Sequence, residues 1–376
     1  MHVDLLIVGG SFAGLACARE AVRHGLSVVV LEKKECPGDK LHTTGIFVKE
    51  AIEECRWFRD APKELFRQID KVRLYAPDMR KLDLYAPGYY FVATETPGLL
   101  NWMADSIRSD GVDVMCGTLF ETVSQTVDGL WKVPVTIGRS KGAGEEKIEI
   151  MARYLIGADG PKSKVARVLG LSENTEFLYG MEKEYQHADL DEDYLHCFLD
   201  KRLASGYIGW GLASQGYFQV GLARRLSSGV KEGLAGELIE FDAFLEKIAP
   251  VIQVNSSPIN VRAGFIPCGG TLKSVACPSA MLIGDAAGTV SPVTAGGIHS
   301  ALRYAQQAGE AVAHYLRGRE NDPAQWFVKK YPRYLTKRLL RWGYDHCQSD
   351  WIFNQVLSSA PFRRFAEQIY FHRKGG

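Results

Sequence analysis

The sequence lacks the marks of several large classes of protein. Its 376 residues carry a formal charge of only +1, so no overall electrostatic field attracts nucleic acid. It has no run of about 18 apolar residues, the length that a membrane-spanning helix needs. Its eight cysteines form no C-x-x-C pair, and no histidines stand near them at the spacing of a zinc site. We therefore expect reduced thiols, no metal site and no nucleic-acid partner.

The beginning of the sequence also lacks the pattern of a secretion signal. A strand pattern starts at Val3, with no basic segment in front of it. The composition, with 46% hydrophobic and 24% charged residues, is ordinary for a globular protein. We expect a cytoplasmic protein whose length accommodates two domains, or one large domain with insertions.

The most informative stretch runs from Val3 to Glu32. It reads as an apolar strand, the glycine-rich turn Gly9–Gly14, a helix with one apolar face, and a second strand that ends at Glu32. This order is typical of dinucleotide-binding proteins, although Ser11 replaces the middle glycine of the usual G-x-G-x-x-G pattern. The helix N-terminus suits a pyrophosphate, and the acid can accept hydrogen bonds from an adenosine ribose. A turn that binds no ligand is the alternative interpretation.

Two later stretches contain a strand that ends in glycine and aspartate. Residues 153–163 end their strand in Gly-Ala-Asp-Gly, after which Ser163 can cap the following helix. Residues 280–288 end in Gly-Asp-Ala-Ala-Gly, and Thr294–Ile298 adds a glycine pair before a helix that extends to about Arg317. Gly284-Asp285 alone has a plain strand-to-turn signal as its alternative interpretation, because glycine and aspartate are common turn residues.

In this order, the three motifs resemble those of the flavoprotein superfamily typified by p-hydroxybenzoate hydroxylase. Within it, the sequence most resembles the geranylgeranyl reductase family. This likeness is carried by Gly264–Gly270, which read GFIPCGG, and by the stretch LIGDAAGTVSPVTAGGIHS that starts at Leu282. Gly206–Trp210, which read GYIGW, resemble a hairpin of the family's substrate domain. The likeness covers most of residues 1–320.

The resemblance implies an α/β fold, in which a Rossmann-like FAD-binding domain of the GR2 type carries an inserted antiparallel-sheet substrate domain and a C-terminal helical segment. Alternating polar and apolar residues between Lys71 and Thr94, and strand patterns between Phe177 and Arg224, agree with an antiparallel sheet. The predicted division assigns residues 1–70, 98–170 and 275–320 to the FAD-binding domain, 71–97 and 171–274 to the substrate domain, and 321–376 to the helical segment.

The resemblance also implies a set of FAD-binding residues. They are Gly9, Gly10, Ser11, Phe12, Ala13, Gly14, Glu32, Lys33, Lys40, Thr44, Gly45, Leu119, Asp159, Gly284, Asp285, Pro292, Gly296, Gly297 and Ile298. The glycine-rich turn would lie along the pyrophosphate. Glu32 would hold the adenosine ribose, Leu119 would lie near the adenine and Asp159 would help to close the site. Asp285 would accept a hydrogen bond from the ribityl chain.

Two groups from this set would lie against the isoalloxazine ring. The segment Gly296–Ile298 would present N–H groups to the N1–C2=O edge, where the helix dipole stabilises the negative charge of reduced flavin by roughly 0.3–2 kcal/mol. Lys40, Thr44 and Gly45 would face the other side of the ring. Archaeal members of the family tend to carry a cysteine in that loop, and this sequence has none there.

Three residues are candidates for a role in the reaction itself: His299, Tyr207 and Trp210. His299 follows the glycine pair and could face the flavin, although a histidine at such a place is more often a packing residue. Tyr207 and Trp210 could line an apolar substrate cavity, or could belong to the core of a sheet. The sequence contains no second glycine-rich fingerprint, so the electron donor is left open between NAD(P)H and reduced ferredoxin.

Three functions agree with these motifs. The first is reduction of the C=C bonds of an apolar, prenyl-like substrate by hydride transfer from reduced FAD. The second is an aromatic monooxygenase that uses a C4a-hydroperoxyflavin, and the third is a flavin-binding protein without turnover. Oxygen separates the first two, because hydroxylation stops without it.

The last part of the sequence, residues 326–376, is basic and aromatic. It holds ten lysine and arginine residues against three aspartate and glutamate residues. Such a segment suits peripheral contact with anionic lipids of a membrane, or forms a solvated helical face over the FAD-binding domain. The sequence leaves the identity of the substrate and the oligomeric state open.

Overall fold

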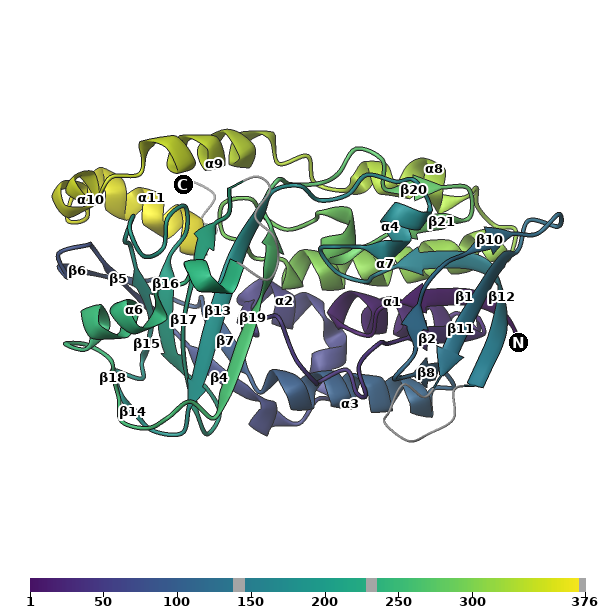
Figure 1. Ribbon diagram of the computed structural model, residues 1–376, viewed down its shortest axis with the longest axis horizontal. Helices are drawn as coiled ribbons and strands as arrows, with labels where there is room; N and C mark the ends of the chain where they lie inside the picture. The colour runs from purple at the N-terminus through teal and green to yellow at the C-terminus, as the bar shows by residue number, and fades with distance from the viewer. Residues whose placement is uncertain (138–145, 228–234, 372–376) are drawn as a thin grey trace.

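The computed structural model describes residues 1–137, 146–227 and 235–371. Two large sheets form the two ends of an elongated molecule, and helices pack beside and above them (Figure 1). One sheet has nine strands and the other has seven. This architecture confirms the expected α/β fold with a second, largely antiparallel sheet.

The nine-stranded sheet contains a parallel core. The core strands are β1 (His2–Val8), β2 (Val28–Leu31), β8 (Asp113–Met115), β12 (Glu146–Gly157) and β21 (Ala280–Leu282). β1 lies between β2 and β12, β8 lies beyond β2, and β21 lies beyond β12. β1 and β2 are nearly continuous apolar runs, as expected of strands buried on both faces. Antiparallel edges are added by β9 (Leu119–Phe120), β10 (Ser124–Gln125), β11 (Trp131–Ile137) and β20 (Ala276–Cys277).

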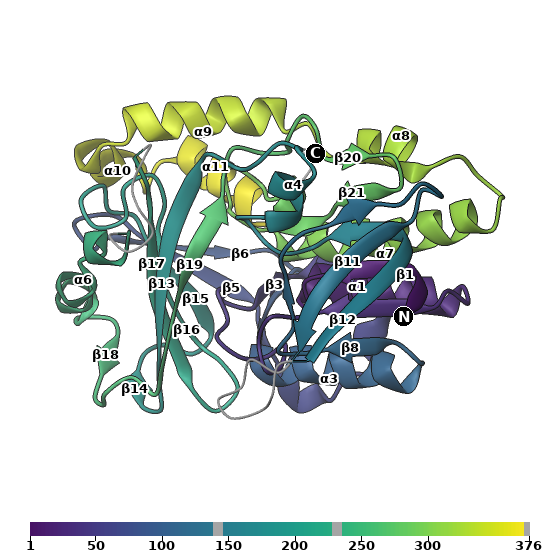
Figure 2. The same cartoon turned by 45° about the vertical axis from the view of Figure 1, so that its right-hand side comes forward.

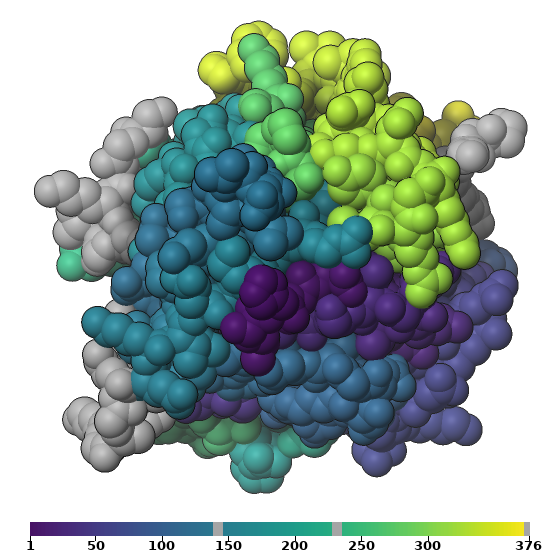
Figure 3. All heavy atoms as spheres, turned by 90° about the vertical axis from the view of Figure 1, so that its right-hand side faces the viewer, coloured from purple at the N-terminus to yellow at the C-terminus, as the bar shows by residue number. Residues whose placement is uncertain are grey.

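Long helices pack against this core. They are α1 (Phe12–Arg23), α3 (Thr96–Ser109) and α7 (Ile298–Leu316). The end of α7 agrees with the helix that the sequence predicts to about Arg317. At the surface, the first residues of the chain (purple) lie between the segment that contains α3 (blue) and the segment that ends α7 and contains α8 (Pro323–Trp326; yellow-green) (Figure 3). Segments from both ends of the sequence therefore share one core.

The seven-stranded sheet forms the other end of the molecule. Its strands are β5 (Lys71–Tyr75), β6 (Lys81–Tyr85), β13 (Phe177–Tyr185), β15 (Tyr194–Phe198), β16 (Gly209–Ala213), β17 (Phe218–Arg225) and β19 (Asn260–Pro267). They follow the order β19-β13-β17-β16-β15-β5-β6, and within the described part of this sheet only β15 and β5 pair in parallel. The parallel pair joins two segments that are far apart in the sequence.

A small sheet connects the two ends. It consists of β3 (Ile46–Val48), β4 (Phe66–Ile69) and β7 (Phe91–Thr94) in the order β3-β7-β4. It therefore joins strands from both sides of the predicted domain boundary at residue 70, and the division into domains stays a prediction. A further pair is formed by β14 (Ala188–Asp189) and β18 (Gln253–Val254).

The C-terminal helices lie along one side of the molecule, over the end that holds the seven-stranded sheet (Figures 1 and 2). They are α9 (Leu335–Cys347), α10 (Asp350–Val356) and α11 (Ala360–Phe371). The described part of residues 321–376 is thus mainly helical, and residues 372–376 lie outside the described structure. Among the described helices, none combines the length and the apolar character that crossing a membrane requires.

Short helices complete the fold. The α-helical ones are α2 (Lys49–Glu54), α4 (Lys164–Val168) and α6 (Phe241–Ile248). The 3₁₀ helices are η1 (Arg56–Arg59), η2 (Lys63–Leu65), η3 (Gly236–Leu238), η4 (Gly284–Ala287) and η5 (Phe327–Lys330).

The contact between α1 and α7 gives a testable prediction. A Cβ at Gly309 would lie 2.5 Å from the Cys17 carbonyl oxygen, so Gly309→Ala forces the two helices apart. We expect this variant to lose about 1–3 kcal/mol of unfolding free energy in urea denaturation. Gly343→Ala is the matched control, because a Cβ at this α9 position meets no described atom within 4 Å. It should match the wild type or gain up to about 1 kcal/mol. Equal stability of all three proteins would contradict the tight contact.

Candidate active site

One large cavity lies where the two ends of the molecule meet. Its volume is about 1210 Å³, and its lining extends from Val8 at the end of β1 to Tyr370 in α11. Pockets for a single small ligand usually measure about 300–1,000 Å³. The cavity therefore has room for a cofactor and a second molecule.

The glycine-rich turn forms one part of the cavity wall. Gly9 has a φ of +110°, and a Cβ there would lie 2.2 Å from the Ala158 carbonyl oxygen. Gly14 lies behind the turn, because its Cβ would be 1.8 Å from the Gly9 carbonyl oxygen. The Ser11 hydroxyl makes no capping hydrogen bond to the described helix α1. The first N–H groups of α1 are therefore available to an anion in the cavity.

Glu32 directly follows β2 and lies beside this turn. It is only 4% exposed, and its two carboxylate oxygens accept hydrogen bonds from the N–H groups of Gly10 at 2.8 Å and Lys34 at 2.9 Å. The carboxylate thus fixes the shape of the turn. Each of its oxygens has a second lone pair that can accept a hydroxyl.

Asp159 lies just after the end of β12 and also lines the cavity. Its carboxylate accepts hydrogen bonds from the Ser163 hydroxyl at 2.6 Å and from the N–H groups of Lys164 at 2.7 Å and Val165 at 3.0 Å. Ser163 in turn accepts from the Ala166 N–H at 2.9 Å, which confirms the helix cap predicted from the sequence. Asp159 therefore caps α4 together with Ser163. Burial raises the pKa of Asp159, against these hydrogen bonds.

The second glycine-rich segment also forms part of the cavity wall. The segment 293–301 lines the cavity, and α7 starts within it at Ile298. Asp285 in η4 lies beside this helix start, since a Cβ at Gly297 would be 3.3 Å from its carboxylate. Burial raises the pKa of Asp285 to about 6.

Most predicted cofactor residues converge on the cavity. Those that line it are Gly9, Gly10, Ser11, Phe12, Ala13, Glu32, Lys33, Thr44, Leu119, Asp159, Asp285, Gly296, Gly297 and Ile298. The remaining ones lie outside the described lining: Gly14, Lys40, Gly45, Gly284 and Pro292. Gly284 supports the wall from behind, because a Cβ there would lie 2.9 Å from the Ala13 Cβ.

The three predicted catalytic candidates also line the cavity, but each side chain already has a partner. The His299 imidazole lies 2.9 Å from a Glu54 carboxylate oxygen. The Tyr207 hydroxyl donates to the Thr294 carbonyl oxygen at 2.6 Å, and the Trp210 indole N–H donates to Glu182 at 2.8 Å. These contacts favour structural roles for Tyr207 and Trp210 in the cavity wall.

A large part of the cavity wall has no clear signal in the sequence. Side chains of the C-terminal helices line the apolar half of the cavity, among them Tyr344, Phe353, Phe362, Phe365, Ile369 and Tyr370. The only signal for them in the sequence is the aromatic composition of residues 326–376, which does not tell where the helices pack.

Comparisons with known proteins show the family to which the chain belongs. Residues 2–206, more than half of the chain, match the family described as FAD binding domain. The chain belongs to the FAD-binding domain family. The matched residues include the glycine-rich turn, Glu32 and Asp159.

Individual relatives narrow this assignment. Digeranylgeranylglycerophospholipid reductase 1 of Methanothermobacter thermautotrophicus is 28% identical over 83% of this chain and 77% of its own length. A geranylgeranyl bacteriochlorophyll reductase-like protein of Thermoplasma acidophilum has the same fold, with a TM-score of 0.82 and 19% identity over 99% of this chain and 97% of its own. A p-nitrophenol 4-monooxygenase of Pseudomonas putida shares the fold with a TM-score of 0.68 and 14% identity over 97% and 96%. This member of the FAD-binding domain family is an FAD-dependent oxidoreductase similar to geranylgeranyl reductases.

The chemistry of the lining fits FAD, although the role of each residue toward it stays a prediction. The N-terminus of α1 offers N–H groups to the anionic pyrophosphate, and Glu32 and Asp285 offer carboxylates to hydroxyl groups. The N-terminus of α7 offers the positive end of a second, longer dipole.

The raised pKa of Asp285 gives a second prediction. A carboxyl whose pKa rises on folding, from 3.8 to about 6, contributes stability at low pH that is lost as the pH rises through 6. Asparagine cannot ionise, so the FAD-free Asp285→Asn variant should be more stable than the wild type at neutral pH. We expect the difference in unfolding free energy to grow by on the order of 1 kcal/mol between about pH 5 and pH 7.5.

Urea denaturation of the FAD-free proteins at several pH values measures this difference. Asp113→Asn is the control, because Asp113 is exposed on β8 and lies outside the described cavity lining. A gap between wild type and Asp285→Asn that stays constant with pH would refute a carboxyl that titrates near 6.

Proposed function

We propose that the protein reduces carbon–carbon double bonds of an apolar, isoprenoid-like substrate with reduced FAD. The observation that carries this proposal is the apolar half of the cavity, which is continuous with the half that fits FAD. Its wall contains aliphatic and aromatic side chains from the seven-stranded sheet and the C-terminal helices, including Leu74, Phe91, Leu195, Leu199, Ile208, Ile266, Phe353, Phe362 and Ile369. Such a wall suits a long hydrocarbon chain, because burial of apolar surface is the main source of affinity.

The relatives support the same substrate class. The reductase of Methanothermobacter thermautotrophicus is named for a digeranylgeranylglycerophospholipid, and we extend a geranylgeranyl-type chain to this protein as a proposal. FAD, when bound, supplies the hydride transfer that side chains cannot perform. The residues of the chain would bind the cofactor, orient the substrate beside it and exclude water.

Two interactions suit this arrangement. The Tyr207 hydroxyl bonds the Thr294 carbonyl oxygen, which ties the substrate wall to the segment before α7. The N-terminus of α7 favours negative charge beside it, as the reduced cofactor would carry, by roughly 0.3–2 kcal/mol. An aromatic monooxygenase, whose fold is similar, is the runner-up, and a flavin carrier without turnover comes third.

Anaerobic turnover tests this function. We expect the FAD-loaded protein, given a geranylgeranyl lipid in detergent, to add two hydrogen atoms to each reduced double bond without oxygen. NAD(P)H and reduced ferredoxin are compared as electron donors, with mass spectrometry of the lipid as the measurement. A product that contains a new oxygen atom and forms only in air would favour the monooxygenase. Reoxidation of the flavin without any product would favour the carrier.

We also propose that the C-terminal helices contact an anionic lipid surface. Leu335, Leu339 and Trp342 are 70%, 69% and 60% exposed, and their spacing puts them on one face of α9. Arg338, which is exposed, adds positive charge to the same helix, and this charge suits anionic headgroups. Leu339 also lines the cavity, so a lipid could pass from this face to the apolar half.

Vesicle sedimentation tests the contact. We expect Leu335→Ser/Trp342→Ser to weaken binding to vesicles of anionic phospholipid by roughly tenfold or more, because two apolar side chains no longer enter the interface. Neither residue belongs to the described cavity lining, so FAD binding should persist. Val127→Ser, at a fully exposed position in the turn between β10 and β11, is the control and should bind vesicles like the wild type. Equal binding by all three proteins would argue for a solvated helical face.

A further inference from the structure

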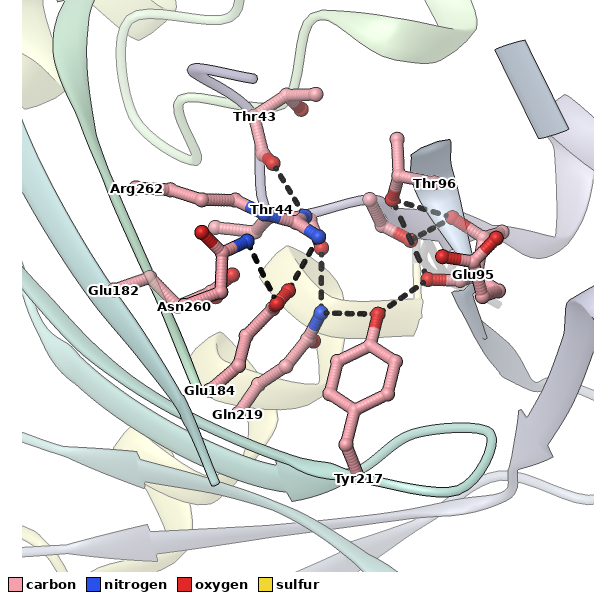
Figure 4. Close-up of polar contacts among 12 residues, drawn as sticks. Thr43, Thr44, Glu95, Thr96, Glu182, Glu184, Tyr217, Gln219, Asn260 and Arg262 are labelled. Atoms are coloured by element: carbon pink, nitrogen blue, oxygen red, sulfur yellow. Dashed lines mark hydrogen bonds and ion pairs between the residues drawn. The ribbon is translucent and has the colours of Figure 1, made fainter. Parts of the chain in front are cut away.

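A short loop, residues 43–45, lies next to polar side chains of the seven-stranded sheet (Figure 4). Thr43 and Thr44 line the cavity, and the sequence resemblance predicts that Thr44 and Gly45 face the flavin. These residues precede β3 and belong to no helix or strand of the described structure. Most of their backbone polar groups therefore need hydrogen-bond partners from outside regular secondary structure, such as side chains.

Three side chains from three strands hold the three carbonyl oxygens of this loop. Arg262 in β19 donates to the Thr43 carbonyl oxygen at 3.2 Å, and Gln219 in β17 donates to the Thr44 carbonyl oxygen at 3.2 Å. The Thr94 hydroxyl in β7 donates to the Gly45 carbonyl oxygen at 2.9 Å. The loop is thereby fixed from two different sheets, and Figure 4 shows Arg262 and Gln219 directed at Thr43 and Thr44.

The arginine belongs to a buried charged cluster. Arg262 forms an ion pair with Glu184, and these residues are 4% and 5% exposed. Asn260 donates a further hydrogen bond to Glu184 at 2.9 Å. Glu182 lies two residues earlier, on the same face of β13, and is 2% exposed. It accepts the hydrogen bond of the Trp210 indole.

The cluster contains two carboxyl groups and one guanidinium. Burial raises the pKa of Glu182 to about 8, and the nearby Glu184 adds to this effect, while Arg262 and the Trp210 hydrogen bond oppose it. Tyr217, which directly precedes β17, is a further titratable group close to both glutamates and to Arg262. At neutral pH a proton on Glu182 leaves the cluster with balanced charge. Above about pH 8, Glu182 loses its proton, and the cluster then carries two negative charges next to one arginine.

Ionisation of Glu182 would disturb the anchor of the loop. One carboxyl oxygen of Glu182 and the Nε of Arg262 have no hydrogen-bond partner among the described residues. A charged Glu182 would therefore compete for the guanidinium with Glu184 and with the Thr43 carbonyl oxygen. We call Glu182, Glu184, Gln219 and Arg262 the loop clamp.

We propose that the loop clamp holds residues 43–45 against bound FAD and loosens when Glu182 loses its proton. Its members are positioning residues, since they act on the cofactor through the loop. The inference rests on the proposed function only in that FAD occupies the cavity. It does not depend on which substrate is reduced.

Hydrogen exchange of the FAD-loaded, full-length protein tests the clamp. In the peptide that covers residues 43–45, we expect Arg262→Met and Gln219→Leu each to exchange about five- to tenfold faster than the wild type, as the loss of one hydrogen bond implies. Arg262→Met leaves the buried charge of Glu184 without its partner, which can unfold the protein. The double variant Arg262→Met/Glu184→Gln removes both charges, so it keeps the test valid in that case. Arg73→Met is the matched control, because this buried arginine of the same sheet pairs with Asp83 and Asp191 and does not line the described cavity. The loop should exchange in this control as in the wild type.

The pH dependence separates the clamp from a merely structural role. After correction for intrinsic exchange rates, protection of the loop in the wild type should fall between pH 7 and pH 9. Glu182→Gln should remove this step and keep the protection seen at neutral pH. A step that persists in Glu182→Gln, or wild-type protection in both Arg262→Met and Gln219→Leu, would overturn the proposal.

The visible spectrum of bound FAD is recorded for every variant. A wild-type protein that holds FAD but reduces no prenyl lipid contradicts the proposed function while the exchange data still decide on the clamp. Conversely, normal reduction of the lipid with an exchange pattern unaffected by all clamp variants rejects the clamp alone.

Discussion

The close approach of the backbone at the glycine-rich turn is the constraint on which the rest of the site depends. A Cβ at Gly9 would collide with the Ala158 carbonyl oxygen, and one at Gly14 would collide with Gly9 itself. Glycine at both positions lets β1, β12 and α1 come together, and this contact directs the N-terminus of α1 into the cavity. Because β1 lies between β2 and β12, the same arrangement brings Glu32 and Asp159 to one edge of the sheet. The carboxyl ends of the parallel strands thus form the cofactor half of the cavity.

Local patterns suffice to predict the parts of the site whose residues are neighbours in the chain. The cap at Ser163 and the start of α7 near Ile298 depend on a few adjacent residues, and the structure has both. The loop clamp is different, because Glu184, Gln219 and Arg262 meet only through the register of β13 with β17 and β19. A shift of one residue in either pairing would turn these side chains to the other face, and no local pattern specifies that register.

The apolar half of the cavity could not be predicted for a related reason. The family resemblance implies a helical C-terminal segment, but the place where an amphipathic helix packs is decided by the surface that it covers. In the structure, Phe371 of α11 packs against Phe91 and Tyr89, beside the strand that also anchors residues 43–45. The C-terminal helices and the small three-stranded sheet therefore close the cavity together. This explains how a segment beyond the family match at residues 2–206 becomes part of the site.

Stability alone does not account for the charges buried behind residues 43–45. Taking an ion out of water costs several kcal/mol, and apolar replacements of a buried ion pair are often neutral or stabilising. A neutral side chain can satisfy a loop carbonyl oxygen equally well, as Gln219 does for Thr44. A guanidinium held by a carboxylate, however, has few alternative positions of similar energy inside a sheet, so it fixes its hydrogen-bond acceptor more narrowly than an amide does. The pair of Arg262 and Glu184 thus determines where Thr43 lies. This position matters because Thr43 lines the cavity.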